Sequence, residues 1–187
     1  LIVDIATQKS GAAVFAVRGK EKGIWVAKPS GDIVQRVPGV DAWVTLADGD
    51  HFWVGTTGSG LWYSADKGES FQQWTKGGVT ALEKVGGAIW ASLPDGRILD
   101  VRSQKTIAHI KNGYASSMAE LGKNNIFLTV SSPNLGAPPF QVLKNGKLST
   151  VSSTKVDDDK SHLSPTQGWS LRNGQALVGS FRRGPLR

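Results

Sequence analysis

Residues 52–71 read FWVGTTGSGLWYSADKGESF, and this stretch decides the fold of the 187-residue chain. It begins with a short apolar run, 52–56, and a second apolar run, 61–63, follows a glycine-rich turn. Aromatic and β-branched residues suit the half-buried surface of a sheet, whereas Gly, Ser and Asp favour turns. The stretch therefore predicts two antiparallel strands, a tight turn at 65–68, and a third strand after it.

Similar apolar runs recur along the chain at a nearly constant interval. They centre on Phe15, Trp53, Trp90 and Phe127, which are separated by 38, 37 and 37 residues. Each run follows one strand-like segment and precedes two more, with short turns rich in Gly, Asp, Asn or Pro between them. Four short strands in a repeat of about 37 residues are typical of a β-propeller, in which small sheets, the blades, pack face to face in a ring.

The repeat predicts an all-β chain, a β-propeller of four-stranded antiparallel blades with about four and a half blades present. The predicted blades span 1–38, 42–75, 79–111 and 116–153, with an incomplete fifth blade at 168–187. We expect a fragment of a six- to eight-bladed ring that a missing segment or another chain completes. A two-layer sandwich with evenly spaced hairpins is the alternative, but a sandwich does not require so constant a repeat.

Composition excludes several classes of protein. The chain has no Cys, which excludes disulfides, thiolate metal sites and Cys nucleophiles. No apolar run approaches 18 residues, so we expect no membrane span. There are 22 Lys and Arg against 15 Asp and Glu, a formal net charge of +7, which favours acidic partners. These basic residues are mostly scattered singly, a pattern that argues against a nucleic-acid partner.

Residues 64–71, SADKGESF, match a Ser-x-Asp-x-Gly-x-Ser/Thr-Phe/Trp pattern. They closely resemble the Asp-box, or bacterial neuraminidase repeat, of a β-propeller superfamily. In that family the box lies on the hairpin between the third and fourth strands of a blade, which is its predicted place here. The resemblance implies a structural role for the matching residues Ser64, Asp66, Gly68, Ser70 and Phe71. Asp66 suits a turn because it can accept backbone N–H bonds, and Gly68 because it permits a positive φ.

Residues 52–62 are similar to the Ile-Trp-Val-Gly-Thr-x-x-Gly-Gly-Leu signature of propellers in two-component sensors and photosystem-assembly proteins. Because Asp-box propellers are mostly exported, the resemblance implies an extracytoplasmic location, periplasmic or secreted. The superfamily contains sialidases and xyloglucan hydrolases as well as non-catalytic assembly factors. The resemblance therefore leaves the activity open.

Catalytic and metal-binding patterns are weak in this chain. A sialidase-like site would need an arginine triad and a Tyr beside a Glu, and Tyr114 with Glu120 is the faint candidate for the Tyr–Glu combination. An ordinary structural role fits both residues better. The histidines lack metal-ligand spacing, and Asp157 to Asp159 lack the alternating ligands of a calcium loop. We expect no catalytic residue, no metal and no cofactor.

Basic residues gather in the predicted loops of one propeller face, which contains the loops between second and third strands and between blades. They are Arg18, Lys20, Lys22, Lys76, Lys111, Arg182 and Arg183. The hypothesis is that this face docks an acidic protein surface or an anionic glycan, although ordinary solubilising charge gives the same pattern. The leading interpretation is a non-catalytic propeller module that binds or scaffolds a macromolecule.

Two other classes of protein remain open. One is part of a glycan-processing Asp-box hydrolase, sialidase-like or xyloglucanase-like, whose flanking sequence would supply the catalytic residues. The other is a ligand-sensing propeller of a membrane kinase, which would have a transmembrane segment downstream.

Overall fold

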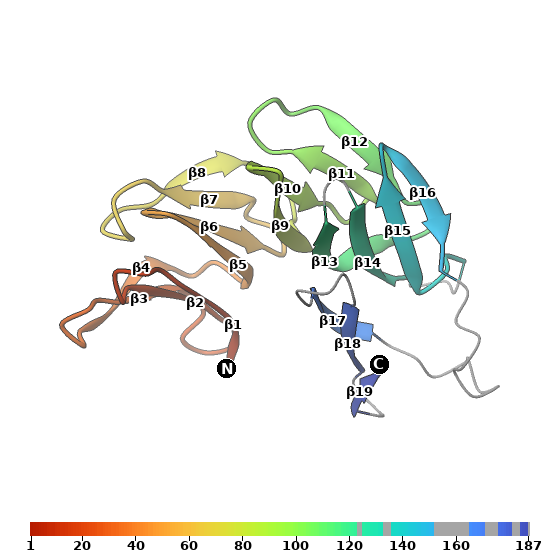
Figure 1. Ribbon diagram of the computed structural model, residues 1–187. Helices are drawn as coiled ribbons and strands as arrows, with labels where there is room; N and C mark the ends of the chain where they lie inside the picture. The colour runs from red at the N-terminus through yellow and green to blue at the C-terminus, as the bar shows by residue number, and fades with distance from the viewer. Residues whose placement is uncertain (123–124, 133–135, 152–164, 171–175, 181–183, 187) are drawn as a thin grey trace. The chain divides into compact units, whose positions relative to one another are not determined.

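The computed structural model describes residues 1–122, 125–132, 136–151, 165–170, 176–180 and 184–186, and side chains as far as residue 151. Within these residues there are strands and turns but no helix, and the strands form five antiparallel sheets (Figure 1). Four sheets have four strands and one has three. In each sheet the strands lie in chain order, as a meander of hairpins. The prediction of four-stranded antiparallel sheets is confirmed.

The chain divides into two compact units, Leu1–Leu82 and Glu83–Arg187. The first unit contains two complete sheets, whose strands, red to yellow in Figure 1, are joined by short turns. The first sheet consists of β1 (Ile2–Thr7), β2 (Ala13–Val17), β3 (Gly23–Ala27) and β4 (Ile33–Pro38). The second consists of β5 (Ala42–Asp48), β6 (His51–Thr56), β7 (Leu61–Ser64) and β8 (Gln72–Thr75).

The remaining strands form three sheets. The third sheet consists of β9 (Ala81–Val85), β10 (Ala88–Ser92), β11 (Arg97–Asp100) and β12 (Thr106–His109). The fourth consists of β13 (Tyr114–Gly122), β14 (Asn125–Ser131), β15 (Phe140–Lys144) and β16 (Lys147–Thr150). The last sheet has three strands, one more than the sequence suggested: β17 (Pro165–Ser170), β18 (Ala176–Ser180) and β19 (Gly184–Leu186).

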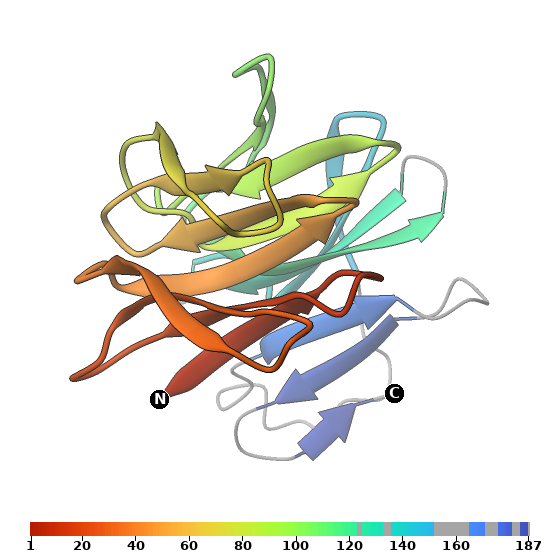
Figure 2. The same cartoon turned by 90° about the vertical axis from the view of Figure 1, so that its left-hand side faces the viewer.

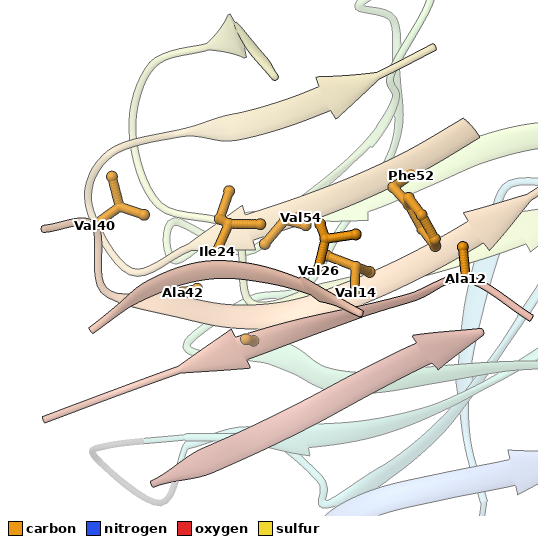
Figure 3. Close-up of a cluster of buried hydrophobic side chains, with 9 residues drawn as sticks. Ala12, Val14, Ile24, Val26, Val40, Ala42, Phe52 and Val54 are labelled. Carbon is orange, nitrogen blue, oxygen red and sulfur yellow. The ribbon is translucent and has the colours of Figure 1, made fainter. Parts of the chain in front are cut away.

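The core of the first unit lies between its two sheets. Successive residues of a strand point to opposite faces, and β2 follows this rule, because Val14 and Ala16 are buried while their neighbours are partly exposed. The buried face of the first sheet packs against Phe52 and Val54 of β6 (Figure 3). Figure 2 shows the strands of the first sheet, red to orange, side by side as a meander. The apolar alternation of the sequence thus becomes an interface between successive sheets.

The first and second sheets can be aligned residue by residue, and this alignment disagrees with the spacing of the aromatic residues at one position. The third strand of the first sheet begins at Gly23 and that of the second follows Gly60, and at both positions a Cβ would collide with the backbone of the fourth strand. Gly23 pairs with Val17, and the Thr56 N–H donates to the Gly60 carbonyl. Val17 and Thr56 therefore occupy equivalent positions. Trp53 lies three residues before Thr56, so its equivalent in the first sheet is Val14, three residues before Val17, and not Phe15.

Candidate functional site

The turn between β7 and β8 is closed by hydrogen bonds among the predicted box residues. The Ser64 hydroxyl donates to Asp66 Oδ1 over 2.7 Å and accepts the Gly68 N–H over 2.9 Å. Ser70 donates its N–H to Asp66 Oδ1 over 3.0 Å and its hydroxyl to Oδ2 over 2.6 Å. The Ser70 bonds contribute most to a pKa of Asp66 lowered to about 2. This carboxylate is therefore ionised and occupied within its own turn.

The same turn packs on the core of the first unit. Gly68 has φ of +88°, and a Cβ at this position would lie 2.9 Å from Val26 Cγ2 of the first sheet. Phe71 packs against the buried cluster that contains Val26 and Phe52. Both the backbone conformation and the lack of space require a glycine at residue 68. These contacts support a structural role for the turn.

A charged contact links the turn to the first sheet on the surface. Glu69 Oε1 lies 2.7 Å from Lys28 Nζ, and Glu69 Oε2 pairs with the guanidinium of Arg36 on β4. These cations, Lys28 first, lower the pKa of Glu69. Because these ion pairs are exposed to solvent, they contribute little to the stability of the fold and mainly orient the Glu69 side chain.

A second arrangement lies at the opposite ends of the strands in the first unit, in the loops after β2, β4 and β6. Arg18 Nε donates to Asp41 Oδ1 over 2.8 Å, and Nη2 donates to Oδ2 over 3.1 Å. The Thr57 hydroxyl donates to Asp41 Oδ2 over 3.1 Å, and the Thr57 N–H donates to the Asp41 carbonyl over 3.0 Å. The hydrogen bonds between the two side chains, and then their opposite charges, raise the pKa of Arg18 and lower that of Asp41.

An exposed tryptophan stands beside this ion pair. Trp43 at the start of β5 is 39% exposed, and Arg18 Cζ lies 5.1 Å from the centroid of its ring. A guanidinium at this distance makes a cation–π contact. We call Arg18, Asp41, Trp43 and Thr57 the Trp43 patch.

Loops that carry lysines lie next to the Trp43 patch. The Lys22 carbonyl accepts the Gly39 N–H over 3.0 Å, and the Lys22 charge contributes to the lowered pKa of Asp41. A bridge between Ser59 and Gly77 brings the loop of Lys76 next to the loop of Thr57. We call the loops 18–22, 39–41, 57–60 and 76–80 the loop face of the first unit. It carries the four basic residues Arg18, Lys20, Lys22 and Lys76 against the two acids Glu21 and Asp41, together with an exposed aromatic ring.

The predicted basic residues have different positions in the structure. Arg18 is engaged by Asp41 and is not a free cation. Lys20, Lys22 and Lys76 lie on the loop face, and no ion pair to them is found within the described part of the chain. Lys111 belongs to the second unit. Arg182 and Arg183, like the run Asp157 to Asp159, lie outside the described residues.

The structure does not bring the faint candidates Tyr114 and Glu120 together. Both residues lie on β13, where Tyr114 pairs with Ser131 and Glu120 pairs with Ile126. Six residues of extended strand separate them by about 20 Å at roughly 3.3 Å per residue. A Tyr and a Glu so far apart cannot act on the same substrate bond.

The sequence reasoning missed a pair of acidic residues in the second unit, Glu83 on β9 and Glu120 on β13. The Glu83 carboxyl accepts a hydrogen bond from the Glu120 N–H, while burial, followed by the Glu120 charge, raises the pKa of Glu83 to about 7. The two residues are 37 residues apart, one repeat, and that spacing could have identified them. Over the described ranges, no group of three or more His, Cys, Asp or Glu is placed to hold a metal ion.

Comparisons with known proteins identify the fold. No protein family and no curated protein matches the sequence. The extracellular domain of the putative hybrid two-component system BT4673 from B. thetaiotaomicron superposes with a TM-score of 0.74 at 12% identity, over 98% of this chain and 26% of that chain. The RRP9 WD40 repeats match with a TM-score of 0.64 at 8% identity, over 96% of this chain and 60% of that chain. The fold is a partial β-propeller.

A third propeller match is to the nidogen/laminin complex, with a TM-score of 0.68 at 8% identity, covering 97% of this chain and 72% of that chain. The chain spans about a quarter of the extracellular domains that it matches in two putative hybrid two-component systems from B. thetaiotaomicron, 26% of BT4673 and 26% of BT3049. Identities this low establish a shared fold and no more. Within the described ranges, no helix is long and apolar enough to cross a membrane.

Proposed function

We propose that the chain is a non-catalytic propeller module that docks or scaffolds a macromolecular partner through the loop face of its first unit. The observation that carries the proposal is the Trp43 patch. Asp41, itself bonded to Thr57, holds Arg18 over the ring of Trp43, and the indole remains 39% exposed. Tryptophan and arginine are enriched among the residues that dominate protein interfaces.

The state of the acidic residues supports a binding role. The carboxylates of Asp41 and Asp66 have lowered pKa values because each accepts several hydrogen bonds. A carboxylate held ionised in this way is a poor general acid at neutral pH. On the loop face, Asp41 therefore has a structural role, because it holds Arg18 and Thr57 in place.

The proposal also includes a protein family and a cellular location. The closed hydrogen bonding of residues 64–71 supports a place among the Asp-box propellers. The matches to extracellular domains of bacterial sensors support an extracytoplasmic location. The match to a chain of the nidogen/laminin complex supports a macromolecular partner for this chain.

Charge reversal tests the proposed docking. In the variant Lys20→Glu, Lys22→Glu, Lys76→Glu, binding to poly-L-glutamate and to a heparin hexasaccharide is expected to fall at least tenfold by calorimetry. The control carries the same change of charge at exposed lysines outside the loop face, as Lys9→Glu, Lys105→Glu, Lys147→Glu. Equal losses in both variants would show that net charge alone attracts these probes, and the proposal would fail.

A glycan hydrolase is the second candidate, and Glu83 with Glu120 is the observation that favours it. A carboxyl with a pKa of about 7 beside a second carboxyl is suited to general acid catalysis of glycoside cleavage. Hydrolysis of nitrophenyl glycosides by the chain, abolished in Glu83→Gln, would support this function. Absence of turnover with sialosides and glucosides alike would leave the binding module.

A further inference from the structure

The Trp43 patch uses several of its directed polar groups internally, and this limits the chemistry of its partner. Arg18 uses Nε and Nη2 on the two oxygens of Asp41, and its guanidinium lies against the ring of Trp43. The Nε–Nη2 edge, two of the five N–H donors of the guanidinium, is therefore occupied by Asp41. Arg18 acts on the partner through Trp43, as a positioning residue.

The Asp41 carboxylate is largely occupied too, because it accepts three hydrogen bonds at its about four acceptor sites. Its Oδ1 accepts from Arg18, and its Oδ2 accepts from both Arg18 and Thr57. A glycan site needs fixed donors and acceptors for the sugar hydroxyls, and the Nε–Nη2 edge of Arg18, both oxygens of Asp41 and the Thr57 hydroxyl proton are already used within the patch. The patch is better suited to an apolar contact than to a network of hydroxyl hydrogen bonds.

Trp43 is held in place by its neighbours. Ala42 is fully buried, and the preceding Asp41 carbonyl accepts the Thr57 N–H over 3.0 Å. The backbone that carries the indole is therefore fixed before a partner arrives. A pre-ordered aromatic side chain loses little conformational entropy on binding, which suits it to be an anchor.

The surrounding lysines supply attraction without fixed geometry. Lys20, Lys22 and Lys76 are exposed side chains on flexible stems. Such charges attract acidic residues over several ångströms and place few demands on their orientation. The surface therefore combines one rigid apolar anchor with diffuse positive charge.

We propose that the Trp43 patch recognises a peptide segment whose aliphatic or aromatic side chain packs on Trp43 and whose flanking Asp or Glu residues face the lysines. This inference rests on the proposed function, because it names the partner of the same loop face. It differs from general anion binding in requiring the apolar side chain. It differs from glycan binding in requiring no directed hydroxyl contacts.

Two matched peptides test the requirement for an apolar side chain. The probes are Ac-Glu-Glu-Leu-Glu-Glu-NH2 and Ac-Glu-Glu-Gly-Glu-Glu-NH2, with the heparin hexasaccharide for comparison. The readout is the indole ¹⁵N–¹H signal of Trp43 in the full chain, assigned by its loss in Trp43→Phe. We expect the Leu peptide to shift this signal and to bind at least tenfold tighter than the Gly peptide. Equal affinities for the two peptides, or tighter binding of heparin than of the Leu peptide, would overturn the inference.

Variants separate this inference from the proposed function. Trp43→Ala is expected to abolish the preference for Leu over Gly, whereas Trp74→Ala, which removes a tryptophan of similar exposure on β8, is expected to keep it. If the lysine reversals weaken both peptides but no Leu preference exists, the proposed function stands and this inference fails. If the reversals match their control, the proposed function itself fails.

The positioning role of Arg18 has its own test. The double variant Arg18→Gln, Asp41→Asn removes one charge of each sign, so the net charge of the loop face is unchanged. We expect it to reduce the Leu-over-Gly preference several-fold and to leave Gly-peptide affinity unchanged. A retained preference, with a folded chain verified by circular dichroism, would contradict the positioning role. Trp43→Phe, which keeps an aromatic ring on the same backbone, is expected to retain part of the preference.

Discussion

The hairpins between the third and fourth strands of the first two sheets occupy the same place in the repeat but are stabilised differently. The turn of the first sheet closes with the Lys28 N–H on the Asp32 carbonyl, and a Cβ at Gly31 would contact nothing within 4 Å. The turn of the second sheet is closed through Asp66, and its Gly68 lies against Val26 of the first sheet. The first turn only connects two strands, whereas the second also forms part of the packing between sheets.

The largest difference between the two turns is expected for a branched side chain at the glycine. Gly68→Val places atoms against Val26 at φ of +88°, so both overpacking and backbone strain reduce the free energy of unfolding, by about 3 kcal/mol. The matched variant Gly31→Val, at φ of +94° in open space, has strain alone and loses about 1 kcal/mol. Urea unfolding followed by tryptophan fluorescence measures both. Equal losses would mean that the second turn does not belong to the packing.

The second largest effect is expected for the pH dependence of stability. Here the buried carboxyl of Glu83 differs from the ionised carboxylate of Asp66 in the second turn. The pKa of Glu83 rises from 4.5 to about 7 on folding, so the folded chain binds the extra proton and stability falls as pH rises between these values. Glu83→Gln is expected to remove this dependence. At pH 8 the variant should be more stable than the wild type by about 2 kcal/mol, with little difference below pH 4. A parallel pH profile for the two proteins would contradict the burial of Glu83.

Loss of the Asp66 side chain is expected to be the third effect in size. Asp66→Ala removes the acceptor of both Ser70 bonds and should lower the free energy of unfolding by about 1.5 kcal/mol, against about 0.5 kcal/mol for Asp32→Ala in the first turn. Because the folded pKa of Asp66 is lowered to about 2, its contribution is present above the unfolded value of 3.8 and is lost as pH falls toward 2. Thermal melts from pH 2 to pH 7 test the sign, which is opposite to that of Glu83.

The smallest effect is expected for the surface contact that joins the second turn to the first sheet. Glu69→Gln weakens the pairs with Lys28 and Arg36, which are exposed to solvent and screened by salt. We expect a loss below that of Asp66→Ala that disappears in about 1 M NaCl. A loss that persists at high salt would mean that the glutamate stem, not its charge, packs on the first sheet.

The sequence predicted the parts of the fold that depend on short-range patterns. Apolar runs and turn residues placed the strands, and the 37-residue spacing grouped them into four-stranded sheets. The same pattern aligned Phe15 with Trp53, although Val14 occupies the equivalent position. The spacing of aromatic residues carries no information on loop length, and the loop 18–22 is longer than the loop 57–59. Only the paired glycines, Gly23 and Gly60, show the correct register.

The candidate site was predicted only in part. The pattern of residues 64–71 indicated a closed turn, because its hydrogen bonds join residues at most four apart. The Arg18–Asp41 pair spans 23 residues, and the sequence places Arg18 only among the basic residues of the predicted loops. Trp43 was not selected at all, since nothing in its local sequence distinguishes an exposed tryptophan from the buried Trp53.

By itself the sequence determined the all-β class, the repeat and the chemistry of the tight turns, because alternation, turn propensity and a local hydrogen-bonded loop are properties of neighbouring residues. The tertiary structure alone decided which charges are paired and which rings are exposed. Those properties arise where Asp41 meets Arg18, where Gly68 meets Val26 and where Glu83 meets Glu120. Each of these contacts joins different sheets, or the loops between them, and depends on how strands distant in sequence pack in space.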